Sequence, residues 1–327
     1  MSLRFSMKSQ SQIELRSRVL RRRIAGGLPA WSKPRLGIDQ AQYPPRLLRL
    51  PASYQSEAPL PRAPAISLVT PCLNHAAFVE QTISSVLDQS YPALEYAVRD
   101  GGSTDGSAEI IGRHAHRLDR FESKPDGGQA SVINHALGES SGEIMGWLNS
   151  DDFLLPGSLA YVGRYFAAHP EVDLVYGHRV MVDERGRDIG RWVMPRHTSE
   201  SVLWFDFIPQ ETAFWRRRLW DRAGGIDESF HVAFDWDLFI RFHFAGARTV
   251  RLPRFLGAIR LHPGQKTQSC AELAQRELRE IRERWHGRPV TLDEAHARVD
   301  LFRLKSVPPY LAHRVAMRLP RPRVTYS

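Results

Sequence analysis

The sequence predicts an α/β fold with a mostly parallel sheet flanked by helices, followed by a mixed β region. Short apolar runs typical of buried strands alternate with amphipathic segments of helical length between residues 66 and 168. Strands and helices in this order form right-handed βαβ units around a parallel sheet. Polar or glycine-rich loops follow these strands, so they should gather at one edge of the sheet, where open α/β sheets bind ligands.

The predicted parallel half contains four strands and four helices. The strands are expected at residues 66–70, 94–99, 120–123 and 143–148. The helices are expected after Phe78 and over residues 108–116, 129–137 and 159–168. Apolar and β-branched runs indicate the strands, and apolar positions three or four residues apart indicate the helices.

After Asp173 the pattern changes to the mixed β region. Residues 174–176 and 179–182 are expected to form separate strands on either side of Gly177-His178. A further strand is expected at residues 212–215, and helices over residues 216–223, 235–244 and 271–285. The last helix has few apolar positions, so we expect it to pack on the body as an appendage.

The net charge of +9 belongs to the N-terminal part of the chain. Residues 1–64 contain 12 Lys+Arg and 3 Asp+Glu, whereas residues 65–327 contain 33 of each. A basic arm suits an anionic membrane surface or nucleic acid, and it equally fits a solvated leader. Frequent prolines between residues 29 and 64 indicate an irregular connector. We therefore expect a basic, Pro-rich extension over residues 1–64, a folded domain over 65–267 and a helical appendage over 268–327.

Composition excludes several classes of protein. Apolar residues make up 42% and charged residues 25% of the chain, as in globular proteins. Apolar runs are far shorter than the roughly 18–20 residues that span a bilayer, and the N-terminus lacks the apolar core of a signal peptide. The two cysteines, Cys72 and Cys270, fit a reducing compartment. We expect a cytoplasmic protein, with peripheral attachment at the inner membrane face through the basic arm.

Asp151 and Asp152 directly follow the strand expected at residues 143–148. Two carboxylates at the carboxyl end of a strand can hold a hard divalent cation against a diphosphate. Aspartates before a turn also serve as solvated caps, so the pair alone leaves both interpretations open. His262 can ligate the same metal, contact a phosphate, or simply lie exposed in its loop.

The loops after the first two strands carry groups suited to a nucleotide. Thr70, Pro71 and Asn74 lie where the first strand ends and offer a hydroxyl and backbone donors to a base or ribose. Asp100 ends the second strand. A carboxylate there can accept a hydrogen bond from a uracil-like imide N–H or a ribose hydroxyl. These residues form our candidate nucleotide site.

Two polar turns lead into helices. Asp105 or Ser107, in the turn after Asp100, is expected to cap the next helix. Asp126 and Gln129 bracket two glycines before the helix over residues 129–137. A helix N-terminus favours anions, so this turn suits a diphosphate. An ordinary glycine turn is the alternative.

Asp235 and Asp237 lie two positions apart at the start of a predicted helix, so they project about 200° apart. Asp235 shares its face with Leu238, Phe239 and Phe242, which turns it toward the core side and the cleft. A partly desolvated carboxylate in this position suits a general base. A helix N-cap is the alternative role.

Together these motifs resemble the family 2 inverting glycosyltransferases of GT-A fold. The resemblance covers about residues 66–267 and rests on five elements in order. They are Val69-Thr70-Pro71-Cys72-Leu73-Asn74, Asp100-Gly101-Gly102-Ser103-Thr104-Asp105-Gly106-Ser107, Asp126-Gly127-Gly128-Gln129 with Asn134, Asn149-Ser150-Asp151-Asp152, and Asp235-Trp236-Asp237-Leu238 with the later Arg260-Leu261-His262. Many members carry Glu-Asp before the last helix, whereas this chain has Phe234-Asp235.

The resemblance implies transfer of a sugar from a nucleotide-diphosphate donor to a glycan or lipid-linked acceptor, with inversion. UDP is the expected nucleotide. Thr70, Pro71 and Asp100 would line the nucleotide pocket. Asp151 and Asp152 would match the metal and diphosphate motif, which implies Mg²⁺ or Mn²⁺ as cofactor. The metal and nearby cations would offset charge on the leaving diphosphate.

The resemblance also assigns the catalytic base to Asp235. A single base suffices for an inverting transfer, because no second carboxylate acts as nucleophile. Lys124 is a candidate additional cation near the phosphates. The acceptor side is expected within residues 176–235. The candidate contacts are Gln210, Trp215, Trp236 and Asp237.

Three other classes of function can be weighed on the sequence. A nucleotidyltransferase that makes sugar nucleotides would carry a glycine-rich loop with a basic residue after the first strand, where this chain has Pro71-Cys72-Leu73-Asn74. A nucleic-acid-binding protein fits the basic arm, but the body is neutral and its aromatic residues do not alternate with basic ones. A non-catalytic sugar-binding relative is disfavoured, because every expected carboxylate is present. We expect no nucleic-acid partner.

Overall fold

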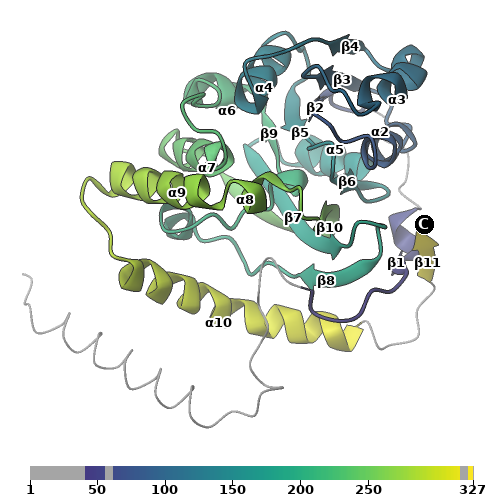
Figure 1. Cartoon of the computed structure of the whole chain (residues 1–327). Helices are drawn as coiled ribbons and strands as arrows, with labels where there is room; N and C mark the ends of the chain where they lie inside the picture. Colours follow the sequence, from purple (N-terminus) through teal and green to yellow (C-terminus); the bar gives the residue numbers. More distant parts are fainter. Residues whose placement is uncertain (1–40, 56–61, 317–322, 327) are drawn as a thin grey trace, which may run out of the picture.

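The computed structural model describes residues 41–55, 62–316 and 323–326. In these ranges a curled central sheet carries helices on both faces (Figure 1). The first part of the sheet contains the strands β2 (Ile66–Cys72), β3 (Leu94–Asp100), β4 (Arg120–Ser123) and β5 (Ile144–Trp147). Between and after them come the helices α2 (Val79–Leu87), α3 (Ser107–His114), α4 (Gln129–Gly138) and α5 (Ser158–Ala168), the last preceded by the short strand β6 (Phe153–Leu154). The predicted alternation of strands and helices is confirmed.

The second part of the chain completes the sheet and adds further helices. Its strands are β7 (Leu174–Val182), β8 (Asp188–Trp192), β9 (Phe214–Arg216) and β10 (Thr249–Arg260). Its helices are α6 (Arg217–Ala223), α7 (Phe234–Phe244), α8 (Lys266–Ser269), α9 (Ala271–His286) and α10 (Leu292–Ala316). A separate two-stranded sheet joins β1 (Leu48–Pro51) to β11 (Arg323–Tyr326).

The main sheet is parallel on one side and mixed on the other. Its strands follow the order β4-β3-β2-β5-β9-β7-β10-β6, and β8 pairs with β7. The pairs β4–β3, β3–β2, β2–β5 and β7–β10 are parallel. The pairs made by β9, β6 and β8 are antiparallel. This is the α/β architecture that the sequence predicts.

Each face of the sheet has its own apolar core. Successive residues of a strand point to opposite faces, and Val69 and Leu68 of β2 accordingly belong to different clusters. The cluster with Val69 packs against α4, α6 and α7 through residues such as Ile133 and Phe239. The cluster with Leu68 packs against α2, α3 and α5 through residues such as Ile83. The helices therefore form a layer on each side of the sheet.

The mixed half differs from the expectation at β7. The prediction of two strands separated at Gly177-His178 is wrong, because residues 174–182 form one continuous strand. A Cβ atom on Gly177 would lie 2.6 Å from Cγ of Leu256 in β10. The glycine therefore permits a close approach of two strands and does not mark a turn. β10 was not predicted at all, because Arg251 and Pro253 interrupt its apolar pattern.

Part of the expected N-terminal extension belongs to the folded body. Leu48 and Leu50 of β1 are buried, and the hydroxyl of Tyr43 donates to Oδ1 of Asp188 at 2.6 Å. The antiparallel pairing of β1 with β11 joins segments near the two ends of the chain, a contact that no local pattern reveals. Residues 1–40, which carry most of the basic arm, lie outside the described ranges. Among the described helices, none combines the length and apolar composition needed to cross a membrane.

Candidate active site

Three side chains from separate segments meet beyond the carboxyl ends of β2 and β5. Nε2 of His262 lies 3.1 Å from Oδ2 of Asp151. With His75, their candidate ligand atoms all lie within 4.8 Å of one another. Nδ1 of His75 lies 2.7 Å from Oγ of Ser150, which orients the ring. Burial lowers the pKa of His75 and favours the neutral imidazole that binds metal ions.

The carboxylate of Asp152 accepts a hydrogen bond from the backbone of β10 and is not part of the three-residue cluster, although Asp152 adjoins Asp151. Its Oδ1 accepts a hydrogen bond from the backbone N–H of Arg260 at 3.0 Å. Burial and the nearby charges of Asp151 and Glu211 raise the pKa of Asp152 well above its usual value. Nε of Arg260 donates to the backbone oxygen of Asp151 at 2.9 Å. In this conformation Asp152 fastens the aspartate loop to β10, while Asp151 and His262 lie together as a shared metal site requires.

The residues expected around the nucleotide base lie in different settings. β2 continues to Cys72, so Thr70 and Pro71 are buried inside the strand and do not lie in the loop. The hydroxyl of Thr70 lies 2.9 Å from that of Tyr96. Asn74 is exposed, and its Oδ1 accepts from the backbone N–H of Thr104 at 2.9 Å. Among these three, Asn74 is therefore the one with its side chain at the surface of the loop.

Asp100 organises the loop at the end of β3. Its Oδ2 accepts hydrogen bonds from the backbone N–H groups of Gly102 and Ser103, at 3.2 and 3.1 Å. The hydroxyl of Ser123, at the end of β4, donates to the same oxygen at 2.6 Å. Asp100 is only 2% exposed. Its carboxylate therefore fixes the shape of two neighbouring strand ends, including one wall of the adjacent cavity.

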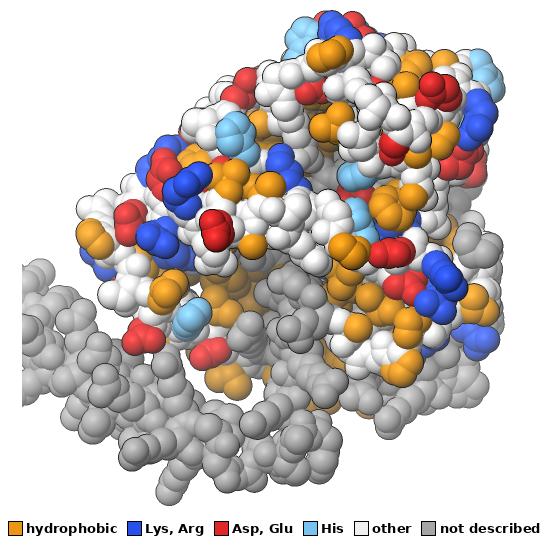
Figure 2. All heavy atoms as spheres, viewed as in Figure 1, with side chains coloured by type: hydrophobic (Ala, Val, Ile, Leu, Met, Phe, Trp, Pro, Cys, Tyr) orange, Lys and Arg blue, Asp and Glu red, His pale blue; other side chains and the backbone are white. Residues whose placement is uncertain are grey.

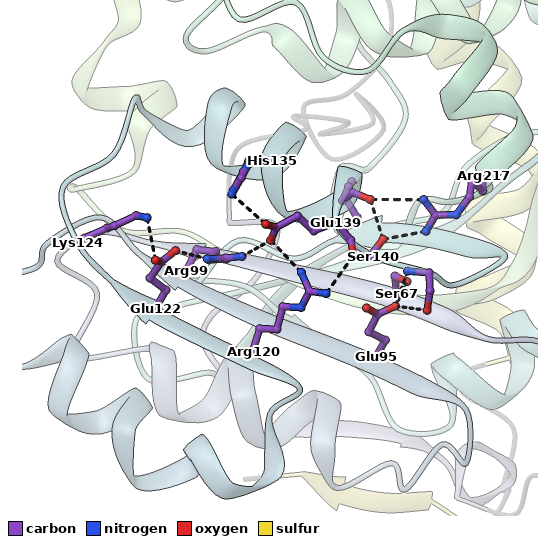
Figure 3. A network of polar contacts seen from close by, with 12 residues as sticks. Ser67, Glu95, Arg99, Arg120, Glu122, Lys124, His135, Glu139, Ser140 and Arg217 are labelled. Atoms are coloured by element: carbon purple, nitrogen blue, oxygen red, sulfur yellow. Dashed lines mark hydrogen bonds and ion pairs between the residues drawn. The ribbon is translucent and has the colours of Figure 1, made fainter.

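A cavity of about 180 Å³ opens beside this loop. Its lining includes Arg99, Asp100, Glu122, Lys124, Asp126, Gly127, Ser131 and His135. Figure 3 shows that charged side chains pair along this edge, with Arg99 lying between Glu122 and Glu139. Nζ of Lys124 lies 2.8 Å from Oε1 of Glu122. Lys124 and Asp126 therefore share one cavity with Asp100, and Lys124 already has an acidic partner.

Lys266 crosses from α8 to α4 at the same edge of the sheet. Its Nζ donates to Oε1 of Gln129 at 3.0 Å, and Nε2 of Gln129 donates to Oδ1 of Asn149 at 2.8 Å. The ammonium also lies 5.6 Å from the centre of the Phe234 ring. Desolvation by the surrounding protein lowers the pKa of Lys266, although the residue is exposed. The contacts place this amine beside the aspartate loop and the start of α7.

Asp235 lies in the first turn of α7 and is half-buried. The helix begins at Phe234, after Ala233 as its N-cap, so the alternative N-cap role does not fit Asp235. Burial raises the pKa of Asp235 to about 6, against the opposing effects of the Trp236 amide and the charge of Arg179. A carboxylate of this pKa is more basic than an ordinary aspartate and is still ionised at neutral pH. These are the properties that a general base requires.

A buried ion pair between Arg179 and Glu211 acts on the two carboxylates with raised pKa values, Asp152 and Asp235. Nε of Arg179 donates to Oε1 of Glu211 at 2.8 Å, and a second guanidinium nitrogen contacts the other oxygen. The positive charge of Arg179 acts on both Asp152 and Asp235. The pair therefore sets the electrostatic environment between the aspartate loop and α7.

α9 holds the segment that leads into α7. The carboxylate of Glu277 is buried and accepts hydrogen bonds from the backbone N–H groups of His231, Val232 and Ala233 at 2.8, 2.8 and 2.9 Å. Three such bonds fix the backbone directly before Asp235. The predicted appendage therefore positions the helix that carries the candidate base.

The residues expected on the acceptor side are all buried. Gln210 donates from Nε2 to a backbone oxygen of β5 at 2.8 Å, and Trp215 has no exposed surface. Nε1 of Trp236 donates to a backbone oxygen in the segment 199–203 at 2.6 Å. Asp237 is fully buried and pairs with Arg241 at 2.7 Å. In this conformation these side chains are buried and bonded to other parts of the protein. We therefore leave them out of the proposed acceptor contacts.

Residues 67–226 match the family model described as Glycosyl transferase family 2. The chain belongs to this family. It is 30% identical over 183 residues to a PGL/p-HBAD biosynthesis glycosyltransferase of Mycobacterium bovis (strain BCG / Pasteur 1173P2), a match covering 55% of this chain and 70% of the relative. It is 29% identical over 188 residues to the hyaluronan synthase of Pasteurella multocida, covering 57% of this chain. The matched segment is only 19% of that synthase.

Solved structures agree on the fold of this family 2 chain. S. aureus TarS 1–349 in complex with UDP has a TM-score of 0.52 at 19% identity, covering 71% of this chain and 68% of that one. The mannosyltransferase PcManGT from Pyrobaculum calidifontis, in complex with GDP-Man and Mn²⁺, has a TM-score of 0.54 at 19% identity, covering 85% and 81%. The GT-A fold implied by the sequence motifs is thereby confirmed.

Three site residues were missed by sequence reasoning about this family 2 chain. His75 directly follows Asn74, and a second histidine in a loop at the predicted sheet edge was a usable signal. Lys266 lies four residues after His262, in the same polar segment. Glu277 gave no signal, because one glutamate in a highly charged helix looks like any solvated residue.

Proposed function

We propose that this chain is an inverting glycosyltransferase in which Asp235 is the general base. The observation that carries the proposal is the half-buried carboxylate of Asp235, with its pKa near 6, at the same sheet edge as Lys266 and the Asp151 cluster. A base, a cation and a candidate metal site are the groups that transfer from a nucleotide-diphosphate sugar requires.

The chemistry follows from a single base. Asp235 removes the proton of the acceptor hydroxyl. The oxygen of that hydroxyl attacks the anomeric carbon of the donor sugar, and the bond from this carbon to the diphosphate breaks. One displacement inverts the configuration at the anomeric carbon. Lys266, with Lys124 in the neighbouring cavity, offers positive charge where the leaving group gains negative charge.

We further propose that His75, Asp151 and His262 hold a divalent metal. Their donor set fits, because two imidazole nitrogens and one carboxylate oxygen lie close enough to share one ion. Imidazole ligands suit Mn²⁺ better than Mg²⁺, which prefers oxygen ligands and keeps its waters. A bound metal would stabilise negative charge on the diphosphate. The Mn²⁺ in the PcManGT complex supports this choice.

The donor is proposed to be a nucleotide-diphosphate sugar, with UDP as the expected nucleotide. TarS structures in complex with UDP and with UDP-GlcNAc support UDP, while the PcManGT complex contains GDP-Man. We keep the exposed Asn74, with Asp100 and Asp126 of the cavity, as the proposed contacts to base and ribose. The names of the relatives support a carbohydrate product, and we keep a glycan or lipid-linked acceptor as the proposal.

The division into a basic extension, a transferase domain over residues 65–267 and a helical C-terminal part also stays a proposal, with residues 41–55 of the extension packed on the body. So does peripheral contact of the arm with the anionic cytoplasmic face of a membrane. Figure 2 shows acidic, basic and histidine side chains interspersed over the upper part of the described surface, in keeping with a body of balanced charge.

The test is nucleotide release from a panel of UDP-sugars and GDP-sugars with MnCl₂, in the presence and absence of a chelator. We expect slow release of nucleoside diphosphate from one donor class, lost on chelation. The anomeric configuration of the transferred sugar, measured by NMR, tests inversion. A nucleotidyltransferase would instead release pyrophosphate from a nucleoside triphosphate and a sugar phosphate, and that result would contradict the proposal.

A further inference from the structure

The exposed face of α10 changes character along the helix. In the first part its exposed side chains are mostly polar, namely Asp293, His296, Arg298 and Asp300. From residue 301 they are mostly apolar, namely Leu301 (48% exposed), Leu304 (49%), Leu311 (53%) and Val315 (61%). Spacings of three, seven and four residues place these four on one side of an α-helix, and α10 continues through Pro308 and Pro309 between Leu304 and Leu311. We call these four residues the α10 apolar face.

This second part of α10 departs from the usual pattern of a surface helix, although its Phe302 is buried. A helix that packs only on its own protein buries its leucines and exposes its serines. Here Ser306 is 1% exposed, and its hydroxyl donates to the backbone oxygen of Phe302 at 3.0 Å. Leu304 and Leu311, on either side of it in sequence, are about half exposed. An apolar stripe on the outer face of a helix indicates a binding surface.

The sequence of this stripe and of the residues after it is basic, although exposed Asp300 directly precedes it. Residues 301–327 contain six Lys+Arg and no Asp or Glu, and Lys305 lies exposed on the helix itself. Figure 1 shows α10 along one edge of the body, far from β4 and α3 at the opposite end. Residues 301–316 therefore combine exposed aliphatic side chains with three basic residues in the sequence, over about 24 Å of helix at 1.5 Å per residue.

We infer that the α10 apolar face docks on an anionic phospholipid surface. Such a surface offers both an apolar layer for the leucines and negative head groups for the basic residues. Two other occupants match the charge poorly. Residues 1–40 contain nine Lys+Arg and two Asp+Glu, and a second copy of α10 would bring its own basic residues. Both would place like charges together.

This inference does not depend on the transfer reaction, because lipid binding is measured without donor or acceptor. The full chain is mixed with sedimenting vesicles of phosphatidylcholine containing about 30% phosphatidylglycerol, and with vesicles of phosphatidylcholine alone. The test variant is Leu301→Gln/Leu304→Gln. The matched control is Leu47→Gln/Leu292→Gln, which alters two leucines that are 56% and 64% exposed outside the apolar face. A second test variant, Arg21→Gln/Arg22→Gln/Arg23→Gln, lowers the charge of the arm.

We expect the wild-type chain and the Leu47/Leu292 variant to sediment with anionic vesicles and the Leu301/Leu304 variant to bind at least about tenfold more weakly. Both leucine variants should keep the wild-type melting temperature, because the altered side chains are exposed. Binding lost only in the Arg21/Arg22/Arg23 variant would assign the contact to the arm and overturn the inference.

Two further results would also overturn it. A wild-type dimer that the Leu301/Leu304 variant dissociates in sedimentation equilibrium would identify a second copy as the occupant. A lowered melting temperature in that variant, with no vesicle binding by either protein, would mean that the chain itself covers the face.

Discussion

Nζ of Lys266 lies 3.0 Å from Oε1 of Gln129, although 137 residues separate them. The contact joins the start of α8 to the start of α4. Gln129 in turn donates a hydrogen bond to Asn149 in the aspartate loop. Lys124, the cation expected from the sequence, pairs with Glu122 instead. The structure therefore presents two candidate lysines for the diphosphate, and their substitutions can be compared directly.

Replacing Lys266 by methionine should raise the KM for the sugar nucleotide by about tenfold or more. A charge-assisted hydrogen bond to a phosphate contributes about 1.5–3 kcal/mol, and methionine keeps the apolar stem while removing the charge. Steady-state kinetics with varied donor measure the effect. Lys124→Met is the matched control, with a change of about threefold or less expected. A larger effect at Lys124 than at Lys266 would reverse the assignment.

The substitution Asp235→Asn should lower turnover by about 10²–10⁴ with nearly unchanged donor affinity, because asparagine keeps the shape but cannot accept a proton. Single-turnover transfer and calorimetric titration with the donor nucleotide separate the two effects. Asp237→Asn serves as the comparison. It should lower stability by about 3 kcal/mol, since Arg241 loses its partner, yet retain more of the chemistry than Asp235→Asn. Normal turnover by Asp235→Asn would contradict the role of base.

The raised pKa of Asp235 should make transfer depend on pH. The base must be ionised, so kcat/KM is expected to rise with pH through about 6 and to level off above it. Stability should change in the opposite direction. A folded-state pKa above the unfolded value means that the folded protein binds this proton more tightly, so stability falls as pH rises from about 4 to above 6.

The combined pH test compares wild-type protein and Asp235→Asn between about pH 4 and pH 8. The variant should be more stable at pH 7, by at most about 3 kcal/mol, with the difference vanishing near pH 4. Partial exposure of the carboxylate lowers the figure. Thermal unfolding measures it without reference to activity. Equal stability at pH 7 together with a flat rate profile would mean that Asp235 titrates as an ordinary aspartate.

The cluster of His75, Asp151 and His262 is expected to bind a metal ion, so removing His75 should weaken metal binding whereas removing a surface histidine should not. His75→Ala should weaken Mn²⁺ binding by at least about tenfold, because removing one of three protein ligands leaves an incomplete site. Calorimetry or electron paramagnetic resonance of Mn²⁺ measures this without substrate. His116→Ala, at an exposed histidine outside the cluster, should bind Mn²⁺ as the wild type does. Unchanged Mn²⁺ affinity in His75→Ala would remove His75 from the site.

Glu277 should act as a positioning residue for the catalytic helix. Glu277→Ala leaves three backbone N–H groups before α7 without their acceptor, so we expect lower thermal stability and reduced turnover. Glu277→Gln retains one acceptor oxygen and should restore part of both. Glu280→Ala, on the same helix with a side chain 56% exposed, should change neither. Stability lost in Glu277→Ala without any effect on turnover would limit the residue to folding.

The parallel half of the fold was readable from the sequence because its signals are local. The strands β2, β3 and β5 are compact, mainly apolar runs, and the loop after each places its polar groups at the same edge of the sheet. β10 was not readable, since Arg251 and Pro253 break its alternation and the strand is stabilised by pairing with β7 on one side and β6 on the other. β1 depends in the same way on β11, more than 270 residues later, as the pair Leu48 and Tyr326 shows.

The sequence by itself determined the α/β order of elements, the aspartate loop, the candidate base and the family resemblance, because all of these depend on residue types at short spacing. Only the tertiary structure decided which of the candidate groups meet. It brought His75 to Asp151 and His262, and Lys266 to Gln129. It also buried the residues expected on the acceptor side. The physical reason is that burial and long-range contact depend on how the sheet curls and which helix covers each face, and no local pattern specifies either.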